Sequence, residues 1–213
     1  MDHQALLAAF SDTVEEAFGV SIVLLVDQSG SMKPFAGAVP EAFDRFVASL
    51  REGGASESSR LAVVTFAERG EIALPFTPLT AELRLEGYAP EGGTRLVDTV
   101  RDVLLALLER TWGEDERVIV AVITDGKDTS STPEGRWELQ SLSLRAQTRD
   151  WTLLTFGIGI DARIAARSLG FPDDPDSAQT LARSAESLFE SLAYVSARSI
   201  PPPGVSGVTK RRH

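Results

Sequence analysis

Oxygen-bearing side chains occur in three separate stretches of this 213-residue sequence. Asp27, Ser29 and Ser31 alternate in DQSGS, directly after an apolar run, Thr94 closes GGT, and Asp125 follows the most hydrophobic run in ITDGKD. Alternate residues of extended backbone share one face, so the first three side chains can point the same way. Carboxylate and hydroxyl oxygens suit a hard cation such as magnesium, calcium or manganese, and not zinc or copper.

The charges and the glycines of these stretches are consistent with a metal site. Two carboxylates would balance a divalent cation, whereas three neutral hydroxyls are weak ligands that leave the cation with an affinity for a further anion. Gly30, Gly92, Gly93 and Gly126 let the loops turn and approach closely. We therefore predict that the five oxygen-bearing residues hold a metal, and we expect them at a rim and not in the core.

The elements that must position these residues alternate between strands and helices. Continuous apolar runs predict buried strands over 21–26, 60–66, 117–124 and 151–158, and a run at 71–77 that contains Pro75 predicts an edge strand. Helical spacing predicts helices over 4–17, 40–52, 95–110, 141–149, 161–169 and 184–199. This order indicates an α/β fold: a doubly wound, mostly parallel sheet with one antiparallel edge strand and helices on both faces. In such sheets ligands bind at the carboxyl ends of the strands, near the topological switch point.

The domain organisation that we expect has three parts. Residues 1–17 form an N-terminal helical extension, residues 18–199 the α/β domain, and residues 200–213 a flexible, Pro/Gly-rich basic tail. The N-terminus has no basic lead or long apolar run, so we expect no signal peptide and a cytoplasmic protein.

Composition excludes several functions. A net charge of −10 argues against nucleic acid and anionic membranes as partners. The chain has no cysteine, and its two histidines are His3 and His213, near the ends. Disulfides, zinc–thiolate sites and a Ser-His-Asp triad are therefore not expected.

The set DxSGSM, GGT and TDG, in this order, resembles the von Willebrand factor type A (VWA) domain over residues 18–199. The resemblance implies a Rossmann-like fold and a non-catalytic, protein-binding module. The positions that match its metal-ion-dependent adhesion site (MIDAS) are Asp27, Ser29, Ser31, Thr94 and Asp125. In the family the hydroxyls contact the metal directly and the aspartates act partly through water. An Asp or Glu of a partner protein completes the coordination of Mg²⁺, with Mn²⁺ or Ca²⁺ as alternatives.

The stretch TFGIGIDARIAARSLG is similar to free-standing bacterial members of that family. Some of these, the TerY-like tellurium-resistance proteins, accompany a protein kinase and a phosphatase, and others assist ring ATPases. The resemblance thus implies an adaptor in bacterial stress response or phosphorylation signalling, or an accessory subunit of a ring ATPase. The oligomeric state and the identity of the partner are left open.

A catalytic alternative uses the same site. Asp27 could be the nucleophile of a metal-dependent hydrolase or phosphatase. Against this, Ser29 stands where an aspartyl-phosphate enzyme of the haloacid dehalogenase type has an acidic residue, and no histidine is available as a base. GIGIDA at 157–162 fits a dinucleotide pattern only weakly, since no acidic residue follows about 20 positions later. We interpret Gly157 and Gly159 as a tight exit from a strand.

Other polar residues have simpler interpretations. Singly, Asp27 and Asp125 could cap helices, the two serines could form turn hydrogen bonds, and Thr94 could cap the helix after it. We expect Asp98 to be an ion-pair partner on a solvated face and Asp128 a loop residue at the rim. Arg95 and Lys127 flank the proposed site and are interpreted as solvated surface cations.

Overall fold

The fold is built on one six-stranded sheet. The structure, a computed structural model, describes residues 1–11, 19–53 and 59–199. The sheet has the order β3-β2-β1-β4-β5-β6, in which only β3 is antiparallel to its neighbour. The strands are β1 Val20–Asp27, β2 Ser59–Phe66, β3 Gly70–Pro78, β4 Arg117–Thr124, β5 Thr152–Ile158 and β6 Ala178–Leu181. The doubly wound, mostly parallel sheet with one antiparallel edge strand is therefore confirmed.

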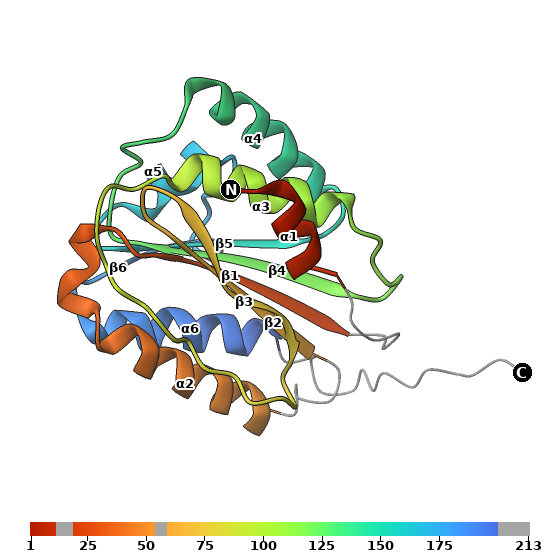
Figure 1. The fold of residues 1–213 in the computed structure, drawn as a ribbon, viewed down its shortest axis with the longest axis horizontal. Coiled ribbons are helices and arrows are strands. Elements are labelled where there is room, and N and C mark those ends of the chain that lie inside the picture. The colour runs from red at the N-terminus through yellow and green to blue at the C-terminus, as the bar shows by residue number, and fades with distance from the viewer. Residues whose placement is uncertain (12–18, 54–58, 200–213) are drawn as a thin grey trace, which may run out of the picture.

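Helices cover both faces of this sheet (Figure 1). They are α1 His3–Ala9, the 3-10 helix η1 Gly30–Phe35, α2 Ala38–Glu52, α3 Leu96–Glu109, α4 Pro133–Gln147, α5 Ala162–Leu169 and α6 Ala185–Ser199. In Figure 1, α2 and α6 lie below the sheet, whereas α1, α3, α4 and α5 lie above it. Alternate residues of β1 enter the two separate cores, Leu24 on the α2/α6 side and Leu25 on the α3 side. This double burial explains why β1 is a continuous apolar run.

The switch point of the sheet lies between β1 and β4. From β1 the chain runs through α2 to β2 on one side, and from β3 it returns through α3 to β4 on the other side of β1. The two strands pair in parallel with Val26 opposite Ile123, so that they end at the same level. Because neighbouring connections leave in opposite directions there, the ends of β1 and β4 bound a crevice suited to a ligand.

Several element boundaries differ from those that we expected. Helix α4 begins at Pro133 and not at residue 141, because the Thr132 side chain accepts a hydrogen bond from the Gly135 N–H and caps a polar first turn. The short edge strand β6 was missed because AQTL carries little hydrophobic signal. Helix α1 ends at Ala9, and the rest of the predicted helix 4–17, from residue 12 on, lies outside the described residues, as does the tail 200–213.

Candidate metal site

Asp27 ends β1 and is fully buried. Its Oδ1 accepts a hydrogen bond from the Ser29 N–H at 2.8 Å, and its Oδ2 accepts one from Thr124 Oγ1 at 2.5 Å. The Tyr88 hydroxyl donates to the Asp27 carbonyl oxygen at 2.6 Å. Burial raises the pKa of Asp27, while the bonds from Ser29 and Thr124 oppose this and the charge of Asp125 adds to it. The carboxyl group is thus tightly held but poorly neutralised.

The two serines connect Asp27 to Asp125. Ser29 Oγ lies 3.1 Å from Ser31 Oγ, and Ser31 Oγ donates to Asp125 Oδ1 at 2.5 Å. Asp125 directly follows β4, so this contact joins the two sides of the switch point. Four of the predicted residues therefore form one connected polar group.

Thr94 is brought to the same place by two neighbouring loops. The Gly30 N–H donates to the Gly92 carbonyl oxygen at 3.0 Å, which ties the loop after β1 to the GGT loop. On the other side, the Thr94 carbonyl oxygen accepts from the Thr129 N–H at 2.8 Å, and the Thr94 N–H donates to Thr129 Oγ1 at 3.0 Å. Thr94 is thereby fixed between the loop after β1 and the loop after β4.

Oxygens from all three stretches surround the space next to Gly126. A Cβ atom built on Gly126 would lie 3.4 Å from Thr94 Oγ1, 3.6 Å from Ser31 Oγ and 3.8 Å from Asp27 Oδ2. In the described residues no group of three His, Cys, Asp or Glu side chains could hold a metal, so the hydroxyls would have to supply part of the ligand set. An all-oxygen set of two carboxylates and three hydroxyls fits a hard cation.

The expectation that the five residues lie at a rim is wrong. Asp27, Ser29, Thr94 and Asp125 are buried, and only Ser31 is exposed. The reason is that the loops that carry them pack on one another through the backbone contacts of Gly30 and Thr94 and cover the strand ends. The space between the oxygens is therefore largely shielded from solvent, which strengthens electrostatic interactions within it.

The environment of Asp98 also differs from our expectation. It is an ion-pair partner, but its side chain is 2% exposed and not on a solvated face. It accepts hydrogen bonds from Arg95 Nε at 2.8 Å and from the Thr132 N–H at 3.2 Å. Burial alone would raise the pKa of Asp98, but the bonds from Arg95 and Thr132 hold it below its usual value. Asp98 therefore fastens the start of α4 to α3.

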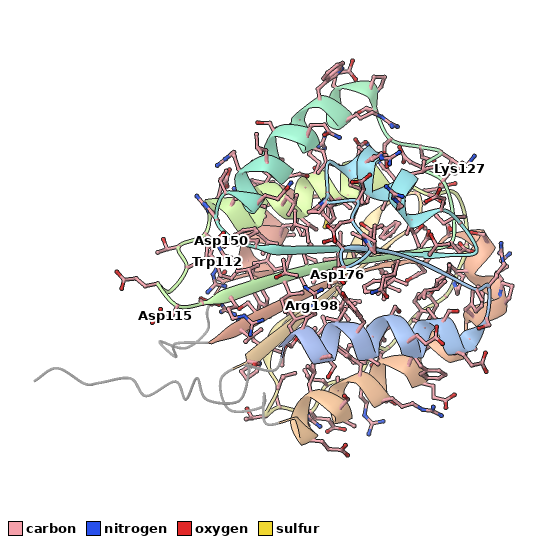
Figure 2. All side chains as sticks on the ribbon, turned by 180° about the vertical axis from the view of Figure 1, so that it is seen from behind. Trp112, Asp115, Lys127, Asp150, Asp176 and Arg198 are labelled. Carbon is pink, nitrogen blue, oxygen red and sulfur yellow. The ribbon has the colours of Figure 1, made fainter. Side chains whose placement is uncertain are left out.

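The remaining flanking residues surround the site at different depths. Arg95 is occupied by Asp98 rather than free in solvent. Asp128 lies in the loop between β4 and α4, with its side chain 8% exposed and Oδ2 3.4 Å from Arg136 Nη2. Lys127 is exposed and lies at the edge of the molecule where the parallel strands end, opposite the edge with Trp112 (Figure 2).

Sequence reasoning missed two side chains that hold the site together. Thr124 directly precedes Asp125, so its bond to Asp27 could have been anticipated from the pairing of β1 with β4. Arg183, by contrast, comes from the turn after β6, and its Nη2 donates to Asp125 Oδ2 at 2.8 Å and to the Ser31 carbonyl oxygen at 3.0 Å. Nothing in the sequence near Arg183 indicates this contact.

The fold and the site together define a class of protein: a doubly wound α/β domain with a cluster of oxygen-bearing side chains at its switch point. A sequence model of the von Willebrand factor type A domain matches residues 21–195. The chain therefore belongs to the von Willebrand factor type A domain family. A search of curated protein sequences finds no match.

Solved structures share the fold at low sequence identity. The pilus adhesin SpaC from Lactobacillus rhamnosus GG has a TM-score of 0.68 at 16% identity, over 90% of this chain and 32% of that one. The vWF domain of the type V pili tip protein Mfa5 from Porphyromonas gingivalis has a TM-score of 0.63 at 14% identity, over 90% and 99%. A von Willebrand factor type A protein from Catenulispora acidiphila has a TM-score of 0.57 at 19% identity, over 86% and 43%. The chain thus spans about a third of SpaC. Within the described residues, no helix is long and apolar enough to cross a membrane.

Proposed function

We propose that this chain is a non-catalytic module that binds a partner protein through a divalent cation. Asp27, Ser29, Ser31, Thr94 and Asp125 would hold Mg²⁺, or Mn²⁺ or Ca²⁺ in its place. When bound there, the cation would accept a carboxylate oxygen from an Asp or Glu of the partner. The chain's own residues orient the hydroxyls toward one space and exclude most of the solvent from it.

One observation carries this proposal: oxygens from three distant stretches converge beside Gly126. Thr94 Oγ1, Ser31 Oγ and Asp27 Oδ2 all lie within 3.8 Å of the position that a Cβ on Gly126 would take. Structural capping or turn formation would satisfy each side chain locally and would not require this convergence. The ligand set has only two acidic groups, so a cation there would favour an additional anionic ligand.

The geometry of Asp27 disfavours the hydrolase alternative. A nucleophilic carboxylate must reach its substrate, but Asp27 is fully buried and both of its oxygens accept hydrogen bonds, from the Ser29 N–H and Thr124 Oγ1. Ser29, the residue two positions on, is also buried and cannot act as a general acid. Binding is therefore the better supported function.

The cellular setting belongs to the proposal as well. The sequence resemblance favours a cytoplasmic, TerY-like adaptor in stress response or phosphorylation signalling, or a ring ATPase accessory subunit. The pilus proteins among the structural neighbours offer the competing setting at a cell surface. The partner would distinguish these settings, because a kinase, a phosphatase, a ring ATPase and a surface ligand are different classes of protein.

The first test measures metal binding by isothermal titration with MnCl₂. We expect the wild type to bind one Mn²⁺ and Thr94→Ala to bind it at least about tenfold more weakly, a loss of about 1.4 kcal/mol. Thr111→Ala, at an exposed threonine just beyond α3, is the matched control and should bind as the wild type does. Equal binding by both variants would contradict the assignment of the site.

The second test captures the partner. The chain is immobilised and exposed to native lysate in magnesium buffer, in EDTA buffer and as Asp27→Ala. We expect a protein that is retained only by the wild type with magnesium and released by EDTA. The same protein retained under all three conditions would mean that the chain binds through another face.

A further inference from the structure

Arg183 reaches the proposed metal site from the edge of the sheet that ends in β6. It lies in the turn between β6 and α6, and β5 separates β6 from the strand that leads to Asp125. Its side chain is 49% exposed, whereas the carboxylate that it pairs with, on Asp125, is fully buried. Both of its hydrogen bonds use Nη2, and among the described residues neither Nε nor Nη1 has a hydrogen-bond partner. Two donor groups therefore remain available for an incoming anion.

Gly159 provides the path along which Arg183 reaches the site. Gly159 has a φ of 72° at the exit of β5, and its N–H donates to the Leu181 carbonyl oxygen at 2.8 Å. A Cβ on Gly159 would lie 3.0 Å from Arg183 Cβ and 3.3 Å from its Cγ. The arginine stem thus lies across a position that must lack a side chain. The GIGIDA stretch, which did not fit nucleotide binding, has a structural use here.

The guanidinium changes the charge balance of the site. Asp27 and Asp125 alone would neutralise a divalent cation, but the contact between Arg183 and Asp125 already compensates one of the two negative charges. With the cation bound, these three side chains would leave one positive charge uncompensated. A positively charged site attracts an anion and repels the cation that it holds.

The surroundings restrict the side from which an anion can approach. On the β2 side, next to Gln28 and Gly92, lies a cavity of about 570 Å³ whose lining includes Glu68, Glu71 and Glu91, with Arg69 as its cation. These carboxylates disfavour an anion on that side. Arg183 reaches the site from the β6 side, so an anion that approaches from there meets a guanidinium.

From these observations we propose that Arg183 sets the ligand preference of the site: it selects a carboxylate-bearing partner and loosens the hold on the cation. The proposal rests on the proposed function, since it needs a bound cation. Arg183 would thus raise the affinity of the site for a carboxylate and lower its affinity for the cation. A residue that merely supports Asp125 would change both affinities in the same direction.

The test uses the full chain and two probes, Mn²⁺ and acetate. Mn²⁺ affinity is measured by isothermal titration, and acetate binding by the broadening of its methyl proton resonance in the Mn²⁺-loaded protein. We expect Arg183→Gln to bind Mn²⁺ roughly three- to tenfold more tightly and acetate several-fold more weakly, the effect being moderated by the partial exposure of the guanidinium. Arg183→Lys keeps the charge and should restore most of both values. Arg163→Gln, at an exposed arginine on α5, is the control.

Each outcome decides the proposal. Opposite shifts in Arg183→Gln, reversed by Arg183→Lys and absent in Arg163→Gln, would support it. Unchanged Mn²⁺ affinity, or weaker binding of both probes, would overturn it while leaving the metal site intact. A wild type that binds no Mn²⁺ would refute the proposed function and this inference with it. Gly159→Ala, which displaces the stem without removing the charge, should shift both affinities as Arg183→Gln does.

Discussion

Gly126 offers the sharpest test of where a cation would lie. In Gly126→Ala the new methyl group would lie 3.4 Å from Thr94 Oγ1, 3.6 Å from Ser31 Oγ and 3.8 Å from Asp27 Oδ2. These are ordinary van der Waals separations, so the metal-free protein can accept the methyl group without moving its neighbours. The methyl group would nevertheless fill the space that the three oxygens share.

The expected magnitudes follow from these distances. Because no contact is too close, the free energy of unfolding should change by less than about 1 kcal/mol, and the reduced freedom of the unfolded chain favours the variant slightly. Metal ligands lie at roughly 2.0–2.6 Å from Mg²⁺ or Ca²⁺, so a methyl group among the ligand oxygens competes directly for the space of the ion. We therefore expect Gly126→Ala to bind the cation at least about a hundredfold more weakly than the wild type, a loss of about 2.7 kcal/mol.

The assay pairs urea unfolding in EDTA with isothermal titration of MnCl₂. Gly37→Ala is the matched control, since a Cβ on Gly37 would meet nothing within 4 Å and lies away from the oxygens. We expect both variants to fold as stably as the wild type, and only Gly126→Ala to lose Mn²⁺. Wild-type Mn²⁺ affinity in Gly126→Ala would refute the reasoning, because the oxygens would then bind the ion outside the space beside Gly126.

Three further predictions concern charge and stability. In EDTA at pH 7, Asp27→Asn should leave the free energy of unfolding unchanged or raise it by up to about 1 kcal/mol. The reason is that the pKa of Asp27 is raised, so its ionised form destabilises the metal-free fold as pH rises. A clear loss of stability in urea unfolding would contradict this. Asp98→Asn should lower the free energy of unfolding by about 2 kcal/mol at pH 7, and this loss should shrink in acid. The pKa of Asp98 is lowered in the folded protein, so the stabilisation that its carboxylate gives disappears as the pH falls through that pKa. A constant difference between variant and wild type from pH 7 to pH 2 would count against this. Mn²⁺ at a hundred times its dissociation constant should stabilise the wild type by about 2.7 kcal/mol and leave Asp125→Ala unchanged, as thermal unfolding with and without the metal would reveal.

The sequence was informative where burial imposes a pattern. Strands β1, β2, β4 and β5 are buried on both faces, and their continuous apolar runs located them within a residue or two. The start of α4 was missed because its first half carries Gly135 and Trp137, which is 81% exposed, so its residues show no apolar stripe. Signals of periodicity fail where an element packs weakly.

The candidate site was predictable as a set of residues but not as an environment. Glycine-flanked, oxygen-bearing side chains after two core strands indicated convergence, and Ser31 indeed contacts Asp125. Burial was not predictable, because it depends on how the loops at Gly30 and Thr94 pack on each other. The contact of Arg183 was not predictable either, since it depends on β6, which has almost no hydrophobic signal.

The electrostatics of the site show why it is hard to explain as structure alone. A buried carboxylate lowers stability unless it is paired, and within the described part of the chain the side chain of Asp27 accepts hydrogen bonds only from neutral donors, on Ser29 and Thr124. The guanidinium of Arg183 is bonded to the neighbouring Asp125 instead. An apolar residue at position 27 would avoid this penalty and would still fit the end of a buried strand. The arrangement therefore makes physical sense as a site whose missing positive charge comes from a ligand, and the free energy of unfolding should respond to that ligand more strongly than to any change among the surrounding surface charges.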